Sequence, residues 1–239
     1  MLFAIIACHH RAWALNAIRE TWLPDIKGRA DYRFFFGRGS HEKAQSDEGI
    51  LDCDDHYRGL ACKVWRICQW ALEHDYEVLF KSDDDTYCRP ERILKVDVEG
   101  KDYIGRINGA TDKYHMSRYA RGGVGYFLSR KAMICLASQP VPNPNLPEDY
   151  AEDSWVGRHL TEGGFECVND GRLHCAPGSG PNRGPRPNGF QGWKEACPTM
   201  HNDTLTVCEF LGSEMLEVHK EWLRTREKFD GLMAKLRIR

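Results

Sequence analysis

The residues best suited to chemistry are three consecutive aspartates, Asp83, Asp84 and Asp85, which come just after the apolar run 78–80. Adjacent carboxylates repel one another, so holding them together costs free energy unless a cation binds among them. Hard divalent cations such as Mg²⁺ and Mn²⁺ prefer oxygen ligands. At the end of a parallel strand, such a cation lies in the crevice where open α/β sheets bind ligands. The triplet therefore predicts a metal site that neutralises a diphosphate.

A solvated turn or a helix N-cap is the alternative explanation of an acidic triplet, because aspartate favours both. The surrounding residues argue against that alternative. Phe80 and Lys81 belong to an expected buried strand, and Thr86 and Tyr87 carry no clear sign of exposure. We therefore expect the aspartates to line a binding site rather than to face open solvent.

A second acidic pair, Glu152-Asp153, begins an expected helix that continues through Trp155 to Gly157. Acidic side chains at a helix start interact favourably with the helix dipole, which explains the pair without any function. The functional alternative is a general base, a carboxylate that accepts the proton of an attacking hydroxyl. Partial burial beside Trp155 would raise the pKa of such a carboxyl towards that task.

Two adjacent glycines, Gly122-Gly123, precede the apolar run 124–128. Glycines there let the backbone approach a ligand closely or adopt positive φ, although an ordinary glycine turn explains them equally well. Basic side chains also stand where they could contact a nucleotide diphosphate, with surface salt bridges as the alternative. They are Arg11, Arg19, Lys63 and Lys81.

The first 85 residues alternate between strand-like and helix-like patterns, which predicts a βαβ nucleotide-binding half. Continuous apolar runs indicate buried strands, and apolar residues at helical spacing indicate helices. The expected strands are 2–7, 32–36 and 78–81, and the expected helices are 13–22 and 60–72. Further along we expect strands 103–106 and 124–128, helices 130–137, 152–162 and 215–229, and an irregular segment from Pro177 to Pro187.

The chain of 239 residues is long enough for one good hydrophobic core, and we expect one domain. Its composition, 41% hydrophobic and 28% charged, is that of an ordinary soluble globular protein. A formal net charge of −2 gives no electrostatic reason to expect nucleic acid as a partner. No stretch approaches the roughly 20 apolar residues needed to cross a bilayer, so we expect no membrane span in this chain.

Ten cysteines are many for a cytosolic protein but too few for a disulfide-dominated scaffold. None forms a C-x-x-C pair, which argues against a structural zinc site. Cys62 and Cys68 lie in the expected helix 60–72 and are interpreted as small core residues. Four others flank the loop-rich last third, where one or two disulfides would form in an oxidising compartment, and their pairing stays open. They are Cys167, Cys175, Cys197 and Cys208.

Taken together, these motifs resemble those of glycosyltransferase family 31, the β-1,3-galactosyl-, N-acetylglucosaminyl- and fringe-type enzymes. Six segments follow the family's order and rough spacing from about residue 3 to residue 160. They are Arg11 to Trp22 with its I-R-E-T-W ending, Phe34-Phe35-Phe36-Gly37, residues 52–63, Lys81-Ser82-Asp83-Asp84-Asp85, Gly122-Gly123-Val124-Gly125-Tyr126, and Glu152-Asp153 with Gly157. One such motif is weak evidence, whereas six in the right order are strong evidence.

The resemblance implies a GT-A glycosyltransferase fold, an α/β architecture in which a Rossmann-like mixed central sheet is flanked by helices. It implies one catalytic domain over 1–239, with a nucleotide-binding half at 1–110 and an acceptor-binding half at 111–239. The implied reaction moves a hexose or N-acetylhexosamine from a UDP-sugar to a glycan hydroxyl, with Mn²⁺ or Mg²⁺, inversion at the anomeric carbon and a β-1,3 linkage. We expect a cytoplasmic location for the chain as written, or the Golgi lumen if it is a truncated form.

The resemblance also assigns roles to individual residues. Asp153 becomes the catalytic base, with Glu152 beside it. Asp85 becomes the principal metal-binding aspartate, and Asp83 and Asp84 lie near the metal and the ribose. The predicted contacts to the donor come from Arg11, Arg19, Lys63, Lys81, Asp83, Asp84, Gly122 and Gly123. The candidate sugar-stacking platforms, with burial in the core as the alternative, are Trp155 and Trp193.

The chain departs from the family's pattern at several positions. In segment 52–63, Cys53 replaces an aromatic residue, and Gly59 and Ala61 replace Asn and Thr. The histidine that serves the family as a metal ligand aligns with Cys208, and a thiolate is a poor ligand for Mn²⁺. We therefore predict His201 as the third ligand, with Cys208 as the alternative.

These departures keep a second function open, that of a non-catalytic carbohydrate-binding protein on the same fold. A metal nuclease or phosphatase is a third possibility, because it would also use clustered aspartates. That third function gives no reason for the glycine motif or the Glu-Asp motif, so we rank it below the other two.

Overall fold

The computed structural model describes residues 1–39, 44–107, 118–146, 149, 151–175, 204–208 and 215–224. Within them, the chain is organised around a seven-stranded sheet. In spatial order its strands are β3 (Glu48–Asp54), β2 (Asp31–Arg38), β1 (Leu2–Ile6), β4 (Val78–Asp83), β7 (Tyr126–Ser129), β6 (Tyr103–Gly105) and β8 (Cys167–Asn169). A smaller three-stranded sheet has the order β5 (Tyr87–Cys88), β10 (Thr206–Cys208) and β9 (Leu173–Cys175).

The main sheet is mixed in direction, which confirms the predicted α/β architecture. Strands β3, β2, β1 and β4 are parallel neighbours, whereas β7 runs antiparallel to both β4 and β6. Every residue of β1 is buried, as a strand with parallel neighbours on both sides requires. Because β1, β2 and β4 point the same way, their carboxyl ends meet at one edge of the sheet. We call it the carboxyl edge.

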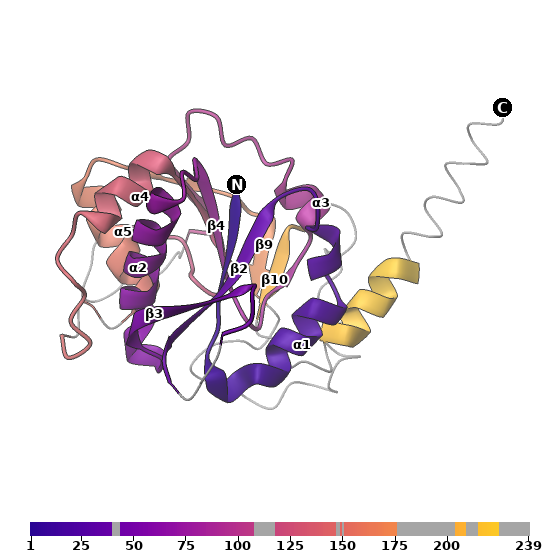
Figure 1. Cartoon of the computed structure of the whole chain (residues 1–239). Coiled ribbons are helices and arrows are strands. Elements are labelled where there is room, and N and C mark those ends of the chain that lie inside the picture. Colours follow the sequence, from indigo (N-terminus) through magenta and orange to yellow (C-terminus); the bar gives the residue numbers. More distant parts are fainter. Residues whose placement is uncertain are drawn as a thin grey trace, which may run out of the picture.

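Helices cover both faces of the main sheet (Figure 1). One face carries α2 (Leu60–Glu73), α4 (Arg130–Ala137) and α5 (Glu152–Glu162), and the other carries α1 (Ala12–Glu20) and the helical residues 215–224. The remaining helical elements are α3 (Pro90–Ile93) and the 3-10 turns η1 (His9–Arg11), η2 (Leu23–Asp25) and η3 (Tyr57–Gly59). No helix in the described part of the chain combines the length and the apolar character that crossing a membrane requires.

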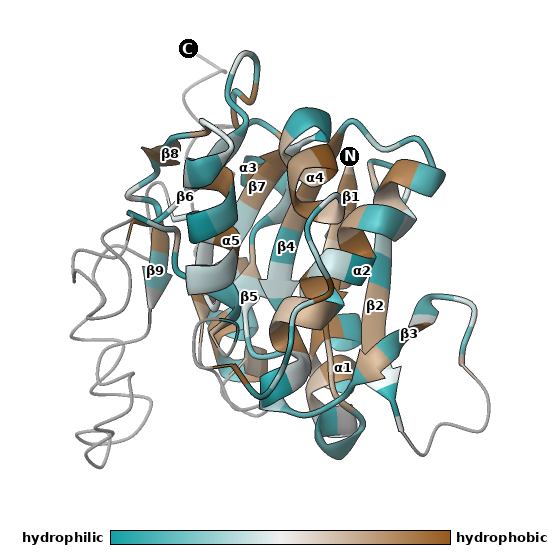
Figure 2. Cartoon of the chain, turned by 90° about the vertical axis from the view of Figure 1, so that its left-hand side faces the viewer, coloured by the Kyte–Doolittle hydropathy of each residue, from teal (hydrophilic) through white to brown (hydrophobic). Residues whose placement is uncertain are grey.

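Alternating side chains of the central strands supply two separate cores. In β1, Phe3 and Ile5 join the cluster on the α1 side, whereas Leu2, Ala4 and Ile6 join the cluster beneath α2, α4 and α5. This alternation is the period of two that a strand imposes on its side chains. Figure 2 shows the apolar strands behind the three helices of the second cluster.

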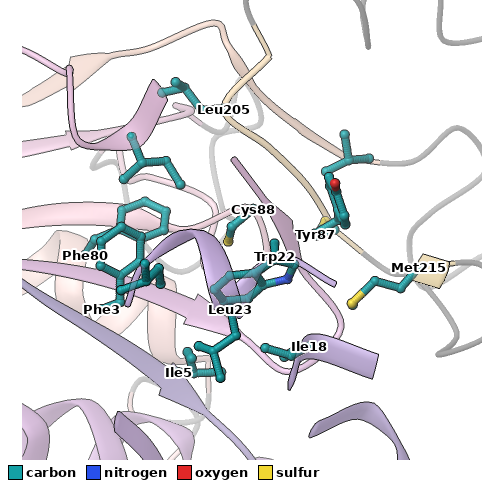
Figure 3. Packing of buried hydrophobic residues seen from close by; sticks show 14 of the residues in the cluster. Phe3, Ile5, Ile18, Trp22, Leu23, Phe80, Tyr87, Cys88, Leu205 and Met215 are labelled. Atoms are coloured by element: carbon teal, nitrogen blue, oxygen red, sulfur yellow. The ribbon is translucent and has the colours of Figure 1, made fainter. Parts of the chain in front are cut away.

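Trp22 anchors the loop that follows the three aspartates. Its ring is buried among Ile18, Leu23 and Cys88 (Figure 3). Its Nε1–H donates a hydrogen bond of 3.1 Å to the carbonyl oxygen of Thr86, a partner that a buried indole N–H needs. The tryptophan that ends the first family-like motif therefore fixes the backbone just after the acidic cluster.

Several elements lie beyond what the sequence pattern predicts. Edge strand β3 has alternating burial in its second half, but Glu48, Gly49 and Asp52 have low strand propensity and obscure that signal. Strands β5, β8, β9 and β10 have only two or three residues, too few for a periodic pattern. The expected helix 215–229 is helical over 215–224, and its remainder lies outside the described residues, as does the segment Pro177 to Pro187.

Asp55 and Lys63 form a buried ion pair at the carboxyl edge. Lys63 Nζ donates to Asp55 Oδ1 at 2.7 Å, and to the carbonyl oxygens of Ala7 and Asp55 at 2.8 and 3.2 Å. Asp55 Oδ1 also accepts from the Gly37 N–H at 2.7 Å, and Oδ2 accepts from the His9 backbone N–H at 2.9 Å. Burial alone would raise the pKa of Asp55, but the bonds from Lys63 and His9 hold it below its ordinary value. These contacts join the ends of β1 and β2 to α2.

We expect Lys63→Met to destabilise the protein by about 3–5 kcal/mol, because it leaves the Asp55 carboxylate buried without its cation. The measurement is the free energy of unfolding from urea denaturation. Lys220→Met is the matched control, since Lys220 pairs with Glu217 at 2.7 Å but both side chains are more than half exposed. Exposed pairs contribute ~1 kcal/mol or less, so equal losses in the two variants would contradict the structural role of Lys63.

Candidate active site

A cleft of about 350 Å³ opens at the carboxyl edge, where β1 and β4 end. Its volume lies in the range of small-molecule sites. The cleft brings together the end of β1, the residues around η3 and the three aspartates after β4. Its lining residues are Ile6, Ala7, Cys8, Arg11, Asp55, His56, Tyr57, Leu60, Lys63, Asp83, Asp84 and Asp85. The aspartates therefore lie where parallel strands of an α/β sheet present a ligand site.

Arg11 is a cation that faces the aspartates. Its Nη1 lies 3.1 Å from Asp84 Oδ1, and its Nη2 lies 3.3 Å from Asp85 Oδ2. The Asp84 side chain is 5% exposed and that of Arg11 is 35% exposed. Burial raises the pKa of Asp84 to about 7 against the attraction of Arg11, and the charges of Asp85 and Asp83 add to the rise. One guanidinium therefore compensates the acidic cluster only in part.

The acidic cluster matches a hard divalent cation in the chemistry of its donors. Carboxylate oxygens are the ligands that Mg²⁺ and Mn²⁺ prefer, and the cluster carries more negative charge than Arg11 alone balances. The ligands are not pre-assembled, because no three His, Cys, Asp or Glu side chains of the described residues converge closely enough to hold a metal ion. A cation at Asp85 would have to compete with Arg11 for that carboxylate. The predicted third ligand, His201, lies outside the described residues.

Cys208, the alternative third ligand, is buried at the end of β10. Its Sγ and the Oδ2 of Asp83 both lie within 4 Å of the position that a Cβ on Gly123 would take. The fold therefore brings Cys208 beside the acidic cluster. Cys175 of β9 lies opposite Cys208 in backbone register, and Cys197 lies outside the described residues. The disulfides expected in this region stay a prediction.

Lys81 connects the acidic cluster with the second acidic pair. Its Nζ lies 2.7 Å from Asp83 Oδ1 and 3.2 Å from Glu152 Oε2, and it donates to the Gly122 carbonyl oxygen at 3.2 Å. Lys81 and Asp83 reach the same region because side chains two positions apart on a strand point to the same face. Burial lowers the pKa of Lys81, but the charges of Asp83 and Glu152 raise it above its ordinary value. The ammonium therefore keeps its charge in the interior.

Glu152 is a buried partner of Lys81. It is the first residue of α5, and its Oε1 accepts a short hydrogen bond from the Tyr126 hydroxyl. Burial raises the pKa of Glu152 to about 7 against the attraction of Lys81. Both carboxylate oxygens thus have partners inside the protein. This pairing with Lys81 and Tyr126 suits a positioning role, and the catalytic role that the sequence predicts for Glu152 stays a prediction.

Asp153, the predicted base, lies on the side of α5 that faces the acidic cluster. Its Oδ2 accepts a hydrogen bond of 3.3 Å from the Gly122 N–H. Burial raises the pKa of Asp153, and the charge of Lys81 lowers it while that of Asp83 raises it further. Burial raises the pKa of Tyr57 as well, with the charge of Asp153 as the next cause. Tyr57 lines the cleft, whereas Asp153 is not among the lining residues, so the coupling with Tyr57 places Asp153 near one residue of the cleft.

The glycine motif makes room for this arrangement. A Cβ on Gly122 would lie 2.2 Å from Glu152 Oε2 and 3.3 Å from Lys81 Nζ. Gly125 has a φ of +87°, which side chains rarely allow, and a Cβ there would meet the Lys81 carbonyl oxygen at 2.7 Å. The nearest atom to a Cβ on Gly123 would be 3.7 Å away. Gly122 is therefore required by packing, whereas a Cβ on Gly123 would make only ordinary contacts with Cys208 and Asp83.

Two of the predicted donor contacts are held by other parts of the protein. Arg19 lies 3.0 Å from Asp47 Oδ1 and 2.9 Å from Glu48 Oε1, and it does not line the cleft. Lys63 does border the cleft, but three protein oxygens already engage its ammonium group. These contacts give both residues a structural role, and their predicted contacts to the donor stay predictions. The sequence cannot show this, because the partners of Arg19 belong to β3 and the loop before it, which no pattern ties to α1.

The predicted sugar-stacking tryptophans and three residues that line the cleft also differ from expectation. Trp155 is 1% exposed and belongs to the core beneath α2, α4 and α5, so it offers no surface for sugar stacking. Trp193 lies outside the described residues. No functional role is predicted from the sequence for Asp55, His56 or Tyr57, which line the cleft. The sequence does hold a signal for two of them, because Asp55 and Tyr57 match the acid and the tyrosine of the family's pattern in segment 52–63.

Comparison with protein families and curated proteins gives limited similarity. No family model matches the chain. Among curated proteins, the chain is similar to the human chondroitin sulfate glucuronyltransferase, with 24% identity over 222 residues. The match covers 85% of this chain and 27% of that protein, so the chain spans about a quarter of the length of this relative.

Solved structures show the fold. A glycosyltransferase involved in the glycosylation of the major capsid of PBCV-1 is similar with a TM-score of 0.51 and 16% identity, over 92% of this chain and 100% of that chain. The galactosyltransferase LgtC in complex with donor and acceptor sugar analogs is similar with a TM-score of 0.51 and 11% identity, over 92% and 96% of the two chains. The predicted GT-A-like fold is therefore confirmed. Membership of family 31 stays a prediction.

We expect Gly122→Ala to destabilise the protein by about 1–3 kcal/mol, because the new methyl group would displace Glu152 from Lys81. Gly123→Ala is the matched control, and its Cβ would find ordinary contact distances, so the expected change is below ~1 kcal/mol. The measurement is the free energy of unfolding of both variants in urea. A larger loss at Gly123 than at Gly122 would contradict the packing of Glu152 under the glycine turn.

Proposed function

We propose that the chain is a metal-dependent inverting glycosyltransferase that moves a hexose or N-acetylhexosamine from a UDP-sugar to a glycan hydroxyl and forms a β-1,3 linkage. The observation that carries this proposal is the arrangement around Lys81. The strand-end acidic cluster lines the cleft, and the buried Lys81 ammonium group joins this cluster, through Asp83, to Glu152, the residue next to Asp153. Donor activation and acceptor deprotonation need two such groups, separated by a space for the sugar.

The donor end of the cleft is assigned to the nucleotide diphosphate. Asp83 and Asp85 are the proposed metal ligands, together with His201. When bound, the divalent cation neutralises the negative charge that develops on the leaving diphosphate. Arg11 lies beside the same aspartates with 35% of its side chain exposed, so its guanidinium is placed to contact the phosphates directly. A guanidinium is well suited to this because it donates two parallel hydrogen bonds to phosphate oxygens.

The acceptor end is assigned to Asp153. Its carboxylate takes the proton of the acceptor hydroxyl, and the hydroxyl oxygen attacks the anomeric carbon from the face opposite the leaving UDP. The bond to UDP breaks as the new glycosidic bond forms, so the configuration inverts. The Gly122 N–H fixes the carboxylate, and the raised pKa of Asp153 makes it a stronger base than an exposed aspartate.

The comparisons support sugar transfer as the class of reaction. The similar solved structures are a glycosyltransferase and a galactosyltransferase, and the similar curated protein is named for glucuronyl transfer. A direct test measures UDP release from a panel of UDP-sugars that includes galactose, N-acetylglucosamine and glucuronate donors. The assay is run with Mn²⁺, with Mg²⁺ and with a chelator. A non-catalytic carbohydrate-binding protein would release no UDP under any of these conditions.

We expect Asp153→Asn to lower kcat by about 10²–10⁴-fold, because an amide cannot accept the acceptor proton. UDP affinity, measured by titration calorimetry, should stay unchanged. Glu162→Gln is the matched control on the same helix, since its side chain is 63% exposed, and it should keep full activity. Near-normal turnover in Asp153→Asn would remove the base assignment.

We expect Asp85→Asn to weaken Mn²⁺-dependent UDP binding by at least about 10-fold, because it removes a charged oxygen ligand. Asp97→Asn is the control, as the Asp97 side chain is 73% exposed and paired with Lys101. Both variants are titrated with UDP in the presence and the absence of Mn²⁺. The metal assignment fails if UDP binds equally well without Mn²⁺, or if Asp85→Asn binds as the unchanged protein does.

A further inference from the structure

Two cysteine thiols lie next to each other beneath the wall of the cleft. Cys53 is in β3 and Cys62 is in the first turn of α2. Both are buried members of the same hydrophobic cluster, 9% and 8% exposed. The two side chains interact with each other, and they are not joined in a disulfide in this structure. The sequence pattern treats Cys62 only as a small core residue, so this pair comes from the fold.

The backbone between the two cysteines explains their closeness. The chain turns sharply after β3, and α2 packs back against that strand. Asp54 Oδ1 accepts a hydrogen bond of 2.9 Å from the His56 N–H, which closes the turn. Gly59 then approaches so closely that a Cβ on it would lie 2.0 Å from the Asp54 carbonyl oxygen. The end of β3 and the start of α2 are thus held in direct contact by packing that does not involve sulfur.

We propose that Cys53 and Cys62 form a disulfide that closes residues 53–62 into a covalent loop and fixes the wall of the cleft. The loop contains Asp55, His56 and Tyr57, which all line the cleft. Joining β3 to α2 at this point limits how far that wall can move away from the acidic cluster. This inference does not depend on the proposed function, because the bond can be detected without any activity.

The chemistry requires an oxidant, which we take to be a small-molecule disulfide such as oxidised glutathione. The Cys62 thiolate attacks one sulfur of that disulfide and expels a thiolate, which gives a mixed disulfide on Cys62. The Cys53 sulfur then attacks the Cys62 sulfur and expels the second thiolate. The two protein thiols lose two electrons and two protons, and the small-molecule disulfide becomes two thiols.

Electrostatics favour Cys62 as the first nucleophile. The hydrogen bond from Cys53 lowers the pKa of Cys62 despite its burial, and the charge of Arg66 lowers it further. The same hydrogen bond and burial raise the pKa of Cys53 above its ordinary value. Thiol–disulfide exchange proceeds through the thiolate, so the pair has one sulfur ready to attack and one that remains protonated until the second step.

The experiment uses the purified full chain, equilibrated with reduced and oxidised glutathione, alkylated and digested with trypsin without reduction. Trypsin cuts after Arg58 and Lys63, so Cys53 falls in peptide 44–58 and Cys62 in peptide 59–63, each with a single cysteine. We expect mass spectrometry to find these two peptides joined, two hydrogens lighter than their sum. The oxidised protein should unfold at a temperature higher by about 5 °C, and amides 54–61 should exchange hydrogen more slowly.

Three cysteine-to-serine variants test whether the effects come from a bond between Cys53 and Cys62. Cys135→Ser removes a half-buried thiol on α4 and should leave the joined peptides and the higher melting temperature unchanged. Cys53→Ser and Cys62→Ser should each abolish both effects. The proposal is overturned if the two peptides remain alkylated and separate in the oxidised folded chain, if either cysteine is joined to a different partner, or if the linkage forms only after denaturation.

Discussion

The buried Lys81 ammonium is the interaction on which the candidate site depends. It joins Asp83, at the end of a central strand, to Glu152, at the start of a helix far away in the sequence. A buried charge is expensive unless it is paired and hydrogen-bonded, so neither the strand end nor the helix start can move without leaving an uncompensated ion. The Tyr126 hydroxyl and the Gly122 carbonyl complete the network. Asp153 follows Glu152 directly in the sequence. The ion pair between Lys81 and Glu152 therefore fixes the position of Asp153, although Asp153 is not a member of that pair.

Asp55 stabilises the part of the cleft around η3 in the same way, as a buried carboxylate that is paired with a lysine. Its carboxylate is satisfied by Lys63, by two backbone N–H groups and by the His9 side chain, all within the protein. The Lys63–Asp55 pair borders the cleft, and the Lys81–Glu152 pair is joined to the acidic cluster through Asp83. Both pairs use residues of family-like motifs. Fixed charges act strongly on a transition state when they are held in place before the ligand arrives, and buried ion pairs such as these hold the elements that carry them together.

The sequence predicts the parts of this arrangement that depend on local pattern. The apolar runs of β1 and β4 and the periodically spaced apolar residues of α2 locate the carboxyl edge. The three consecutive aspartates at that edge predict a metal site. Pairings between distant segments leave no local trace. Arg19 has the positive charge that a phosphate contact needs, but it forms ion pairs with Asp47 and Glu48. In the sequence alone, Glu152 is as good a candidate for a general base as Asp153, because its burial is not known. The two differ only in the direction that the first turn of α5 gives them.

The acids of the cleft can be sorted by how completely the protein satisfies them. Asp55 and Glu152 have protein partners for both oxygens, so replacing those partners costs stability and gives no chemistry. The triplet differs, because Arg11 is shared between Asp84 and Asp85 and remains about a third exposed. Burial is the main reason that the pKa of Asp84 rises to about 7 although Arg11 lies beside it, and the charges of Asp85 and Asp83 add to the rise. Strongly shifted carboxyl pKa values of this kind are found more often at functional sites than elsewhere, so the triplet with its partly exposed arginine is the part of the cleft where a ligand is best sought.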